Sequence, residues 1–306
     1  MLDFKDLDLL SKKYNFYKVG VSRPFLNSFF KEKFVEAINS GLYDGLKWLL
    51  NRKDIRLNPA KYFPWVKSIL VFVDNYFYPF VGVTPTISKY ALGLDYHNII
   101  RVGIQSVMED LKKKYNELIY KVYVDHGPFL EKVYAVQAGI GSYGKNSVVY
   151  FNNIGSYCFI GIALINMEVV GFPNRENRTD ICGDCDICIK SCPAGAIIKP
   201  YVVDPSKCIS YLTIEKKGAF SIEEKSNIKK SGYFYGCDIC QDVCPLNKQF
   251  ARDTVKAEYF KNKYLFEGGV DKLFSLDSAE FMKIFNSTAI ERIGFDRFKR
   301  NLEIFR

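Results

Sequence analysis

The chain has 306 residues and a net charge of +9, from 43 basic and 34 acidic side chains. An apolar fraction of 48% and a charged fraction of 25% are typical of a globular protein, and no stretch approaches the roughly 20 apolar residues of a membrane-spanning helix. The first residues, Met1-Leu-Asp-Phe-Lys-Asp6, are charged and lack the apolar core of a signal peptide, so we expect a cytoplasmic protein without a membrane partner. The positive charge is compatible with an anionic partner such as a nucleic acid.

Strand and helix patterns alternate through the first half of the chain. Short apolar or alternating runs predict strands at residues 68–73, 118–124, 147–151 and 157–165. Helical periodicity predicts helices at residues 99–114 and 128–138, with Pro128 near the first turn of the second. Helical patterning returns in the tail at residues 278–285 and 298–305. These patterns predict an α+β fold whose first part is mixed α/β.

Cysteine placement divides the chain. Residues 1–157 contain no cysteine, whereas eight cysteines lie between Cys182 and Cys244. The polar, turn-rich residues 171–181 predict a boundary between these parts. We therefore expect an α/β domain over residues 1–170, a cysteine-rich domain over residues 171–255 and a helical C-terminal segment over residues 256–306.

The cysteines form two groups with the spacing of bacterial ferredoxins. The first is Cys182-x2-Cys185-x2-Cys188-x3-Cys192-Pro193, and the second is Cys237-x2-Cys240-x3-Cys244-Pro245 with Cys208 displaced upstream. In two-cluster ferredoxins three thiolates of a run hold one [4Fe–4S] cluster and the fourth reaches the other. We expect the Cys-Pro ending to start a helix that carries the fourth sulfur away.

The spacing therefore predicts two [4Fe–4S] clusters that transfer electrons. The expected ligand sets are Cys182, Cys185, Cys188 and Cys244 for one cluster, and Cys208, Cys237, Cys240 and Cys192 for the other. Structural zinc is the alternative, since paired CxxC motifs also bind zinc, but the two Cys-Pro endings and the total of eight favour iron–sulfur clusters. Cys158 lies in an apolar strand pattern and is expected in the core.

Residues Gly139-Ile-Gly-Ser-Tyr-Gly144 match the GxGxxG pattern of dinucleotide-binding proteins. That site needs a strand before the glycines and a helix after them. Here a helical pattern precedes and a strand pattern follows, which argues against a dinucleotide site. We expect these glycines to let the backbone approach another bulky ligand.

Asp125 follows a strand pattern and precedes His-Gly-Pro. A carboxyl group at a strand end that faces a pocket can donate a proton. On spacing alone, a second interpretation is favoured, in which Asp125 caps the helix expected after Pro128.

The order of these motifs resembles that of a known family. The chain carries Arg56-x-x-Pro59, Ile87-Ser-Lys-Tyr-Ala-Leu-Gly93 with Asp95-Tyr-His97, Val124-Asp-His-Gly-Pro128 with Glu131, Ala138-Gly-Ile-Gly-Ser-Tyr-Gly-Lys-Asn146, Gly155-Ser156 and both cysteine groups. This set resembles epoxyqueuosine reductases, the cobalamin-dependent iron–sulfur enzymes that complete queuosine synthesis in tRNA. The resemblance runs from about residue 15 to the C-terminus.

The resemblance implies a nitroreductase-like N-terminal domain that binds cobalamin, with Asp125 as the proton donor. Positions that match the family's cobalamin contacts are Arg56, Ser88, Asp125, Val149, Ile160 and Ser210. It also implies a tRNA substrate with epoxyqueuosine in the anticodon loop, and an electron donor such as flavodoxin or ferredoxin. His126 departs from the family pattern, which usually has a small residue there, and so does Ser142-Tyr143, which replaces a pair that begins with a large aromatic residue.

The resemblance further implies base-off cobalamin without a protein histidine ligand. Asp95-x-His97 begins the signature of proteins that ligate cobalt through histidine, but Ile100 replaces its glycine, so His97 is expected to be structural. Two alternatives remain at this point. One is another corrinoid reductase, such as a reductive dehalogenase. The other is a ferredoxin-type electron carrier with no chemistry of its own.

Overall fold

The structure is a computed structural model of the chain. It describes residues 1–80, 85–173, 180–262, 264–265 and 269–306. The fold contains both helices and strands, as the sequence predicts. The chain forms two compact units, the first from residues 1–75, 97–144 and 148–183, and the second from residues 76–96, 145–147 and 184–306. In the described residues no helix is both long and apolar enough to cross a membrane.

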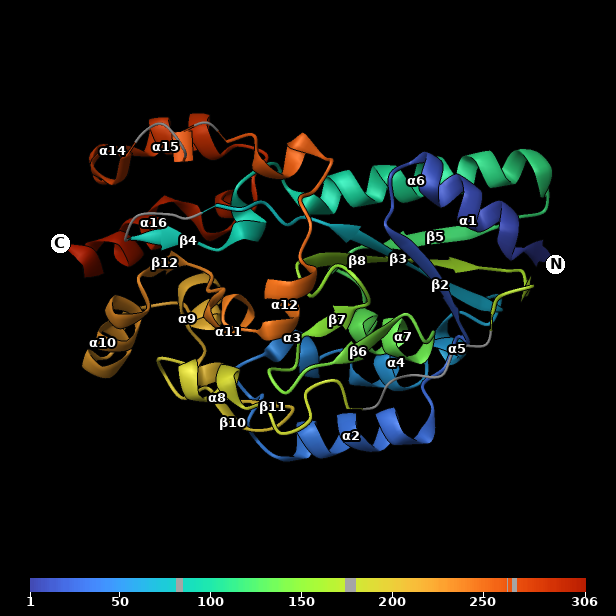
Figure 1. The fold of residues 1–306 in the computed structure, drawn as a ribbon, viewed down its shortest axis with the longest axis horizontal. Helices are drawn as coiled ribbons and strands as arrows, with labels where there is room; N and C mark the ends of the chain where they lie inside the picture. The colour runs from blue at the N-terminus through green and yellow to red at the C-terminus, as the bar shows by residue number, and fades with distance from the viewer. Residues whose placement is uncertain (81–84, 174–179, 263, 266–268) are drawn as a thin grey trace. The chain divides into compact units, whose positions relative to one another are not determined.

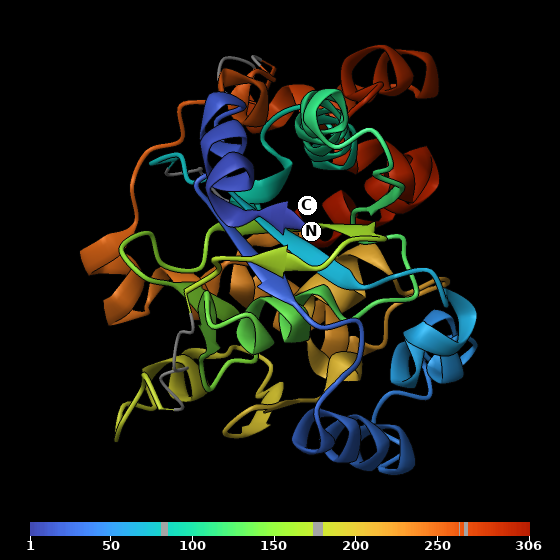
Figure 2. The same ribbon diagram turned by 90° about the vertical axis from the view of Figure 1, so that its right-hand side faces the viewer.

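The first unit is built on a four-stranded antiparallel sheet with the order β2-β3-β8-β5 (Figure 1). Its two central strands are apolar and buried almost throughout, because helices cover both faces. Figures 1 and 2 show α1 and α6 on one face, and α7 with α2–α5 on the other. The strands are β2 (Lys18–Ser22), β3 (Ser68–Asn75), β5 (Tyr120–Tyr123) and β8 (Cys158–Ile165).

Alternate residues of the sheet pack on opposite faces. Ile69 and Val71 belong to the core cluster that includes α7. On the other face Gly161 brings β8 against α6, where a β-carbon at this position would lie 2.6 Å from both Ile100 and Ile104. The helices are α1 (Phe4–Lys13), α2 (Ser28–Asn39), α3 (Lys47–Leu50), α4 (Lys53–Leu57), α5 (Pro59–Tyr62), α6 (Tyr96–Lys114) and α7 (Glu131–Gln137).

The predicted elements of this unit are present, with one informative difference. The strands predicted at residues 68–73, 118–124, 147–151 and 157–165 correspond to β3, β5, β7 (Val149–Phe151) and β8, and α6 covers the helix predicted at residues 99–114. The helix predicted from Pro128 begins instead at Glu131, because residues 124–130 form a turn. Two short strand pairs complete the unit: β1 (Leu2–Asp3) with β9 (Val169–Val170), and β6 (Gly141–Tyr143) with β7.

The second unit consists of short elements around two small apolar clusters. One cluster joins residues 87–92 to the C-terminal helices, and the other surrounds α9 and α10. Its helices are α8 (Ile187–Ser191), α9 (Ile209–Ile214), α10 (Ile222–Ser231), α11 (Ile239–Asp242), α12 (Pro245–Phe250), α14 (Gly269–Ser275), α15 (Ser278–Phe285) and α16 (Gly294–Leu302). Its strands are β4 (Thr86–Ile87), β10 (Ile197–Lys199), β11 (Val202–Val203) and β12 (Tyr233–Tyr235).

Helical turns of the 3-10 type occur at Lys89–Ala91, Pro205–Lys207, Ala257–Phe260, Ala289–Ile293 and Glu303–Phe305. The helix predicted at residues 278–285 corresponds to α15, and the one at residues 298–305 to the end of α16 and the 3-10 turn after it. Of the boundary segment predicted at residues 171–181, residues 174–179 lie outside the described part of the chain.

Candidate functional site

Asp125 lies in the turn between β5 and α7, in the left-handed backbone conformation with a φ of +57°. Asp adopts this conformation more readily than most residues. Its backbone N–H donates a hydrogen bond to Oε1 of Glu131 at 3.1 Å, and its side chain is 62% exposed. Helix α7 has Leu130 at its N-cap and no side-chain cap hydrogen bond. The interpretation of Asp125 as a helix cap is therefore wrong.

Both histidines of the chain lie beside Asp125. His97 is buried at the start of α6, and its Nε2 lies 3.4 Å from Oδ2 of Asp125. The His126 ring lies 4.3 Å from the His97 ring, centre to centre. The Nδ1 atom of His126 lies 3.0 Å from the carbonyl oxygen of Val124. His97 thus contacts the predicted proton donor, and its structural role stays a prediction.

Glu131 is the residue whose role sequence reasoning missed. Burial raises the pKa of its carboxyl group to about 8, and the negative charge of Asp125 acts in the same direction. Hydrogen bonding to backbone N–H groups and the positive charge of Arg56 counteract this rise in the pKa. At neutral pH Glu131 is therefore mostly an uncharged acid that accepts the Asp125 N–H. An acidic residue in the first turn of a helix is common, so only the fold reveals this role.

Arg56 of α4 is 3% exposed, and its Nε and Nη1 atoms find no hydrogen-bond partner in the described residues. Burial lowers the pKa of its guanidinium group, although the charge of Glu131 opposes this. The guanidinium carbon lies 5.7 Å from the centre of the Trp48 ring. The hydroxyl of Tyr134, one turn after Glu131 on α7, is likewise buried without a partner in the described residues. Unsatisfied buried donors are rare in native proteins and indicate an acceptor that completes the site.

Gly141 and Gly144 of the GxGxxG match belong to a hairpin, whereas Gly139 lies in the turn after α7. Gly141 begins β6, and a β-carbon there would lie 2.6 Å from Cγ1 of Val149 on β7. The chain therefore lacks the strand-to-helix turn of a dinucleotide site at this point. Close packing within the hairpin explains Gly141, without the bulky ligand that the sequence suggested for it. Val149 is 3% exposed in the core cluster, and Ile160 packs partly buried against the same cluster.

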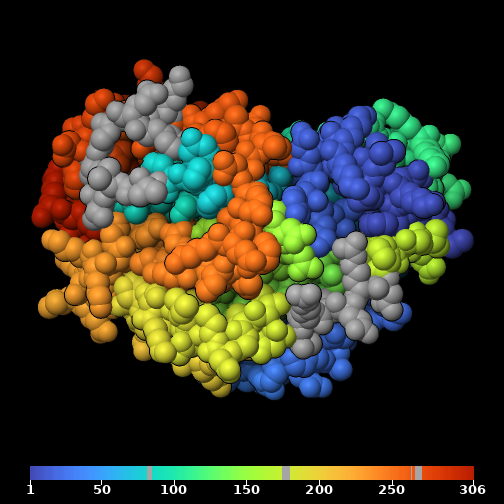
Figure 3. All heavy atoms as spheres, in the orientation of Figure 1, coloured from blue at the N-terminus to red at the C-terminus, as the bar shows by residue number. Residues whose placement is uncertain are grey.

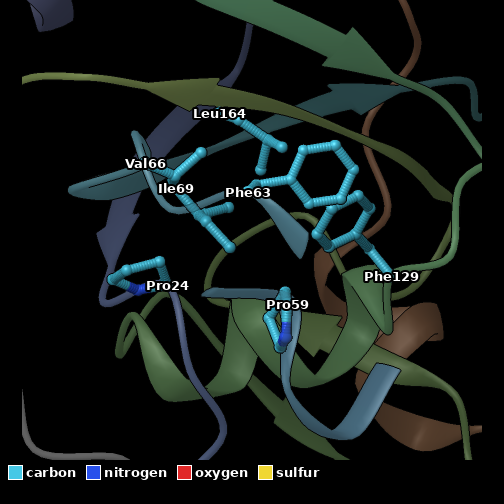
Figure 4. Close-up of a pocket in the computed structure, with 7 residues that line it drawn as sticks. All are labelled: Pro24, Pro59, Phe63, Val66, Ile69, Phe129 and Leu164. Atoms are coloured by element: carbon cyan, nitrogen blue, oxygen red, sulfur yellow. The ribbon is translucent and has the colours of Figure 1, made fainter. Parts of the chain in front are cut away.

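A small hollow lies beside α5 (Figure 4). It has no room for a water molecule, and all of its lining side chains are apolar. We attribute it to imperfect packing rather than to ligand binding. The lining residues are Pro24, Pro59, Phe63, Val66, Ile69, Phe129 and Leu164.

The cysteines of the second unit lie on short helices and at their ends. Cys188 is in α8, Cys240 is in α11, and these helices pack against each other. Cys208 and Cys244 are the N-caps of α9 and α12. The segment containing these cysteines, yellow to orange in Figure 3, lies on the face of the molecule shown there.

The two Cys-Pro endings differ. Pro245 begins α12, as expected, but Cys192 and Pro193 follow the end of α8, so the first ending terminates a helix instead of starting one. Proline shortly after a helix end is common because it cannot continue the helix. Cys192 Sγ accepts a hydrogen bond from the Ala196 N–H at 3.2 Å. Cys182 belongs to the first compact unit, and its N–H donates to Oδ1 of Asp180.

Three cysteines of one predicted ligand set are close enough for their charges to interact. Burial raises the pKa of the Cys240 thiol to about 12, and the charge of Cys208 adds to this rise, while a hydrogen bond from Asn146 opposes it. Burial also raises the pKa of Cys237, with contributions from Cys240 and Cys208. A raised pKa keeps these thiols protonated at neutral pH, and binding to a metal would deprotonate them. Three members of the second predicted ligand set thus lie near one another.

Ser88 lies beside the second cysteine group. Its hydroxyl donates a short hydrogen bond to Oδ1 of Asp238, and the Lys89 N–H donates to Oδ2 at 2.7 Å. Asp238 is 1% exposed and lies between Cys237 and Cys240 in the sequence. The structure thus connects Ser88 to the cysteine loop, a link that sequence reasoning missed because residues 88 and 238 are far apart. Ser210 is half-buried in α9.

Within each unit the structure connects some of the predicted site residues. Glu131 connects Arg56 with Asp125 in the first unit, whereas Ser88 is joined to the cysteine loop in the second. The sequence signal for Glu131 is its place beside Asp125 in the family motif, whereas its burial and its hydrogen bond come only from the fold.

Two protein-family models match parts of the chain. A family model described as "4Fe-4S double cluster binding domain" matches residues 181–247. A second, described as "Epoxyqueuosine reductase QueG, DUF1730", matches residues 56–126, which include Arg56 and Asp125.

Relatives cover most of the chain. The epoxyqueuosine reductase of Aliivibrio fischeri is 33% identical over 98% of this chain and 81% of its own length. That of Leadbetterella byssophila is 36% identical over 87% of this chain and 85% of its own.

Solved structures are similar over the same extent. A crystal structure of selenomethionine-labelled epoxyqueuosine reductase aligns with a TM-score of 0.84 at 26% identity, over 98% of this chain and 80% of that one. A structure of the enzyme with an epoxyqueuosine-modified tRNA-Tyr stem loop aligns with a TM-score of 0.82 at 25% identity, with the same coverage. With relatives this similar over nearly its whole length, the chain belongs to the epoxyqueuosine reductase family.

Proposed function

We propose that this chain is an oxidoreductase that reduces epoxyqueuosine to queuosine in tRNA, the last step of queuosine biosynthesis. The main observation behind the proposal is that one chain contains both a double-cluster domain and a family-specific segment that ends at the Asp125 turn. Relatives named epoxyqueuosine reductase at 33–36% identity support it. No observation favours the reductive dehalogenase or the ferredoxin-type carrier.

The two [4Fe–4S] clusters would be held by the ligand sets that the spacing predicts. These are Cys182, Cys185, Cys188 and Cys244 for one cluster, and Cys208, Cys237, Cys240 and Cys192 for the other. Such clusters supply single electrons. The interacting charges of Cys208, Cys237 and Cys240 support the second set.

Cobalamin would be held by Arg56, Ser88, Asp125, Val149, Ile160 and Ser210. The unsatisfied guanidinium atoms of Arg56 fit this molecule, whose amide and phosphate oxygens are hydrogen-bond acceptors. Bound there, cobalamin would supply reducing electrons to the substrate carbon. His97 is engaged with Asp125, which supports a base-off form without a histidine ligand.

Asp125 would provide the proton. Conversion of the epoxide consumes two electrons and two protons, and its oxygen leaves as water. A half-exposed carboxyl group in a turn can reach a substrate and is replenished with protons from solvent. Asp125 would protonate the departing oxygen.

Glu131 and His97 would position this acid. Glu131 accepts the backbone N–H of Asp125, which favours the left-handed conformation of that residue. His97 lies within 3.4 Å of the carboxyl group and restricts its rotation. Glu131 would thus hold the backbone of Asp125, and His97 would hold its carboxyl group.

The finer assignments follow from the family resemblance. Residues 1–170 would form a nitroreductase-like cobalamin domain, residues 171–255 a ferredoxin-like domain and residues 256–306 a helical segment. A flavodoxin or ferredoxin would deliver electrons one at a time to the clusters. A tRNA substrate agrees with the cytoplasmic location expected from the sequence.

Turnover of a defined substrate tests the proposal. Anaerobically reconstituted protein with added cobalamin and a chemical reductant should convert an epoxyqueuosine-containing anticodon stem loop to queuosine, as measured by mass spectrometry of the nucleosides. Protein that binds about eight iron atoms and cobalamin but leaves the epoxide intact would refute the proposed activity.

A further inference from the structure

Helices α3–α5 present positive charges that other side chains do not neutralise. Residues 47–62 contain five basic residues and one acidic residue. Lys47, Arg52, Lys53 and Lys61 are exposed, and no ion pair connects them to any described residue. Elsewhere in the first unit several exposed lysines are paired, for example Lys12 with Asp8 at 2.6 Å. The unpaired charges leave this surface free to bind an anion.

Two large aromatic side chains are exposed among these cations. Trp48 is 54% exposed and Tyr62 is 45% exposed. Exposed aromatic rings beside unpaired cations are typical of surfaces that bind unpaired nucleotides, because bases stack on the rings while cations contact phosphates. We call the side chains of Lys47, Trp48, Arg52, Lys53, Lys61 and Tyr62 the α3–α5 surface, after the three helices labelled in Figure 1.

Two links connect the α3–α5 surface to the Asp125 turn within the first unit. Arg56, on the buried side of α4, acts electrostatically on Glu131, which binds the Asp125 N–H. The ring of Phe63, directly after α5, lies 6.4 Å, centre to centre, from the ring of Tyr123. Tyr123 ends β5 and precedes Asp125 by two residues. The buried sides of α4 and α5 therefore adjoin the Asp125 turn, and a nucleic acid on their exposed side would be bound by the same part of the first unit.

We propose that the α3–α5 surface binds the anticodon stem loop of the tRNA substrate. Lys47, Arg52, Lys53 and Lys61 contact backbone phosphates, and Trp48 and Tyr62 stack on unpaired loop bases. This inference rests on the proposed function for the identity of the RNA. It assigns tRNA contacts that the sequence alone does not indicate.

The test is RNA affinity as a function of salt. A variant with Lys47, Arg52, Lys53 and Lys61 changed to Ala should bind an epoxyqueuosine-containing stem loop roughly 100-fold more weakly at 0.1 M salt. The slope of log affinity against log salt should fall by about one for each phosphate that the variant no longer neutralises. The matched control changes Lys217, Lys225, Lys229 and Lys230 to Ala, which removes the same charge from exposed lysines in the second unit. The control should keep most of the affinity.

Trp48 separates stacking from charge. Trp48→Ala should weaken binding roughly 5- to 100-fold with little change in the salt slope, and Trp48→Phe should retain most of the affinity. Iron content and circular dichroism verify that each variant is folded. Equal losses in the lysine control and the α3–α5 variant, or unchanged binding by the latter, would overturn the inference. Because binding is measured without turnover, an inactive wild type that still binds through this surface would refute only the proposed reaction.

Discussion

The cysteine segment of the second unit and the Asp125 turn of the first hold their reactive groups by different means. The cysteines lie on short elements such as α8 and α11, with five and four residues, and around small apolar clusters. The Asp125 turn is attached to a sheet whose central strands have eight residues each. We therefore expect the cysteine segment to gain order when its clusters bind, whereas the Asp125 turn is held by an apolar core.

Loss of a cluster ligand should produce the largest effect. Cys240→Ala removes a thiolate from a crowded set, so we expect about four of eight iron atoms to remain and turnover to disappear. Iron analysis and electron paramagnetic resonance measure this. Cys158→Ala is the matched control, because Cys158 lies in β8 outside both ligand sets and should keep all the iron. Full iron content in Cys240→Ala would exclude Cys240 as a ligand.

Asp125→Asn should leave both clusters and cobalamin in place and lower turnover roughly 10²- to 10⁴-fold, because an amide cannot supply the proton. Single-turnover conversion of the stem loop measures the effect. Asp277→Asn changes an acid that caps α15 and should leave turnover unaffected, since Asn is also a good cap. Near-normal turnover in Asp125→Asn would assign the proton to another group.

Glu131→Ala should lower turnover about tenfold by removing the acceptor of the Asp125 N–H. Glu131→Gln keeps an oxygen at this position and should restore most of the activity. The loss should appear in kcat rather than KM, since Glu131 acts through Asp125. In an Asp125→Asn background, Glu131→Ala should have no further effect on turnover. Additive losses in the double variant would show that Glu131 acts independently of Asp125.

The last prediction concerns stability as a function of pH, which is measured without turnover. Folded protein keeps the Glu131 proton up to about pH 8, whereas the unfolded chain releases it near the ordinary value of 4.5. The folded state binds more protons in this window, so stability falls as pH rises through it, by up to about 1.4 kcal/mol per pH unit, and levels off above pH 8.

Glu131→Gln should remove this contribution and be more stable than wild type at pH 8 to 9. Chemical unfolding of both proteins from pH 5 to 9 measures the difference between their slopes. Parallel slopes would show that Glu131 titrates normally in the folded protein.

The two regions also differ in how far the sequence indicates their chemistry. Apart from Cys208, neighbouring cysteines of each group are separated by two or three residues, so one loop or helix turn gathers them and the spacing itself reveals a cluster site. The first Cys-Pro ending was interpreted wrongly because the same dipeptide follows one helix, α8, and begins another, α12. Proline is compatible with both positions.

Local patterns in the sequence predicted the helices and strands of the first unit, because strand alternation depends on neighbouring residues. The close spacing of the cysteines likewise predicted the cluster ligands, because it too is a local property of the sequence. Only the tertiary structure decided that Asp125 is not a cap, that Glu131 accepts its N–H and that Ser88 meets Asp238. The hydrogen bond between Asp125 and Glu131 joins a turn to a helix. The hydrogen bond between Ser88 and Asp238 joins residues 150 positions apart. Burial and left-handed backbone geometry, which set the Glu131 pKa and direct Asp125, arise when the sheet and its helices pack together.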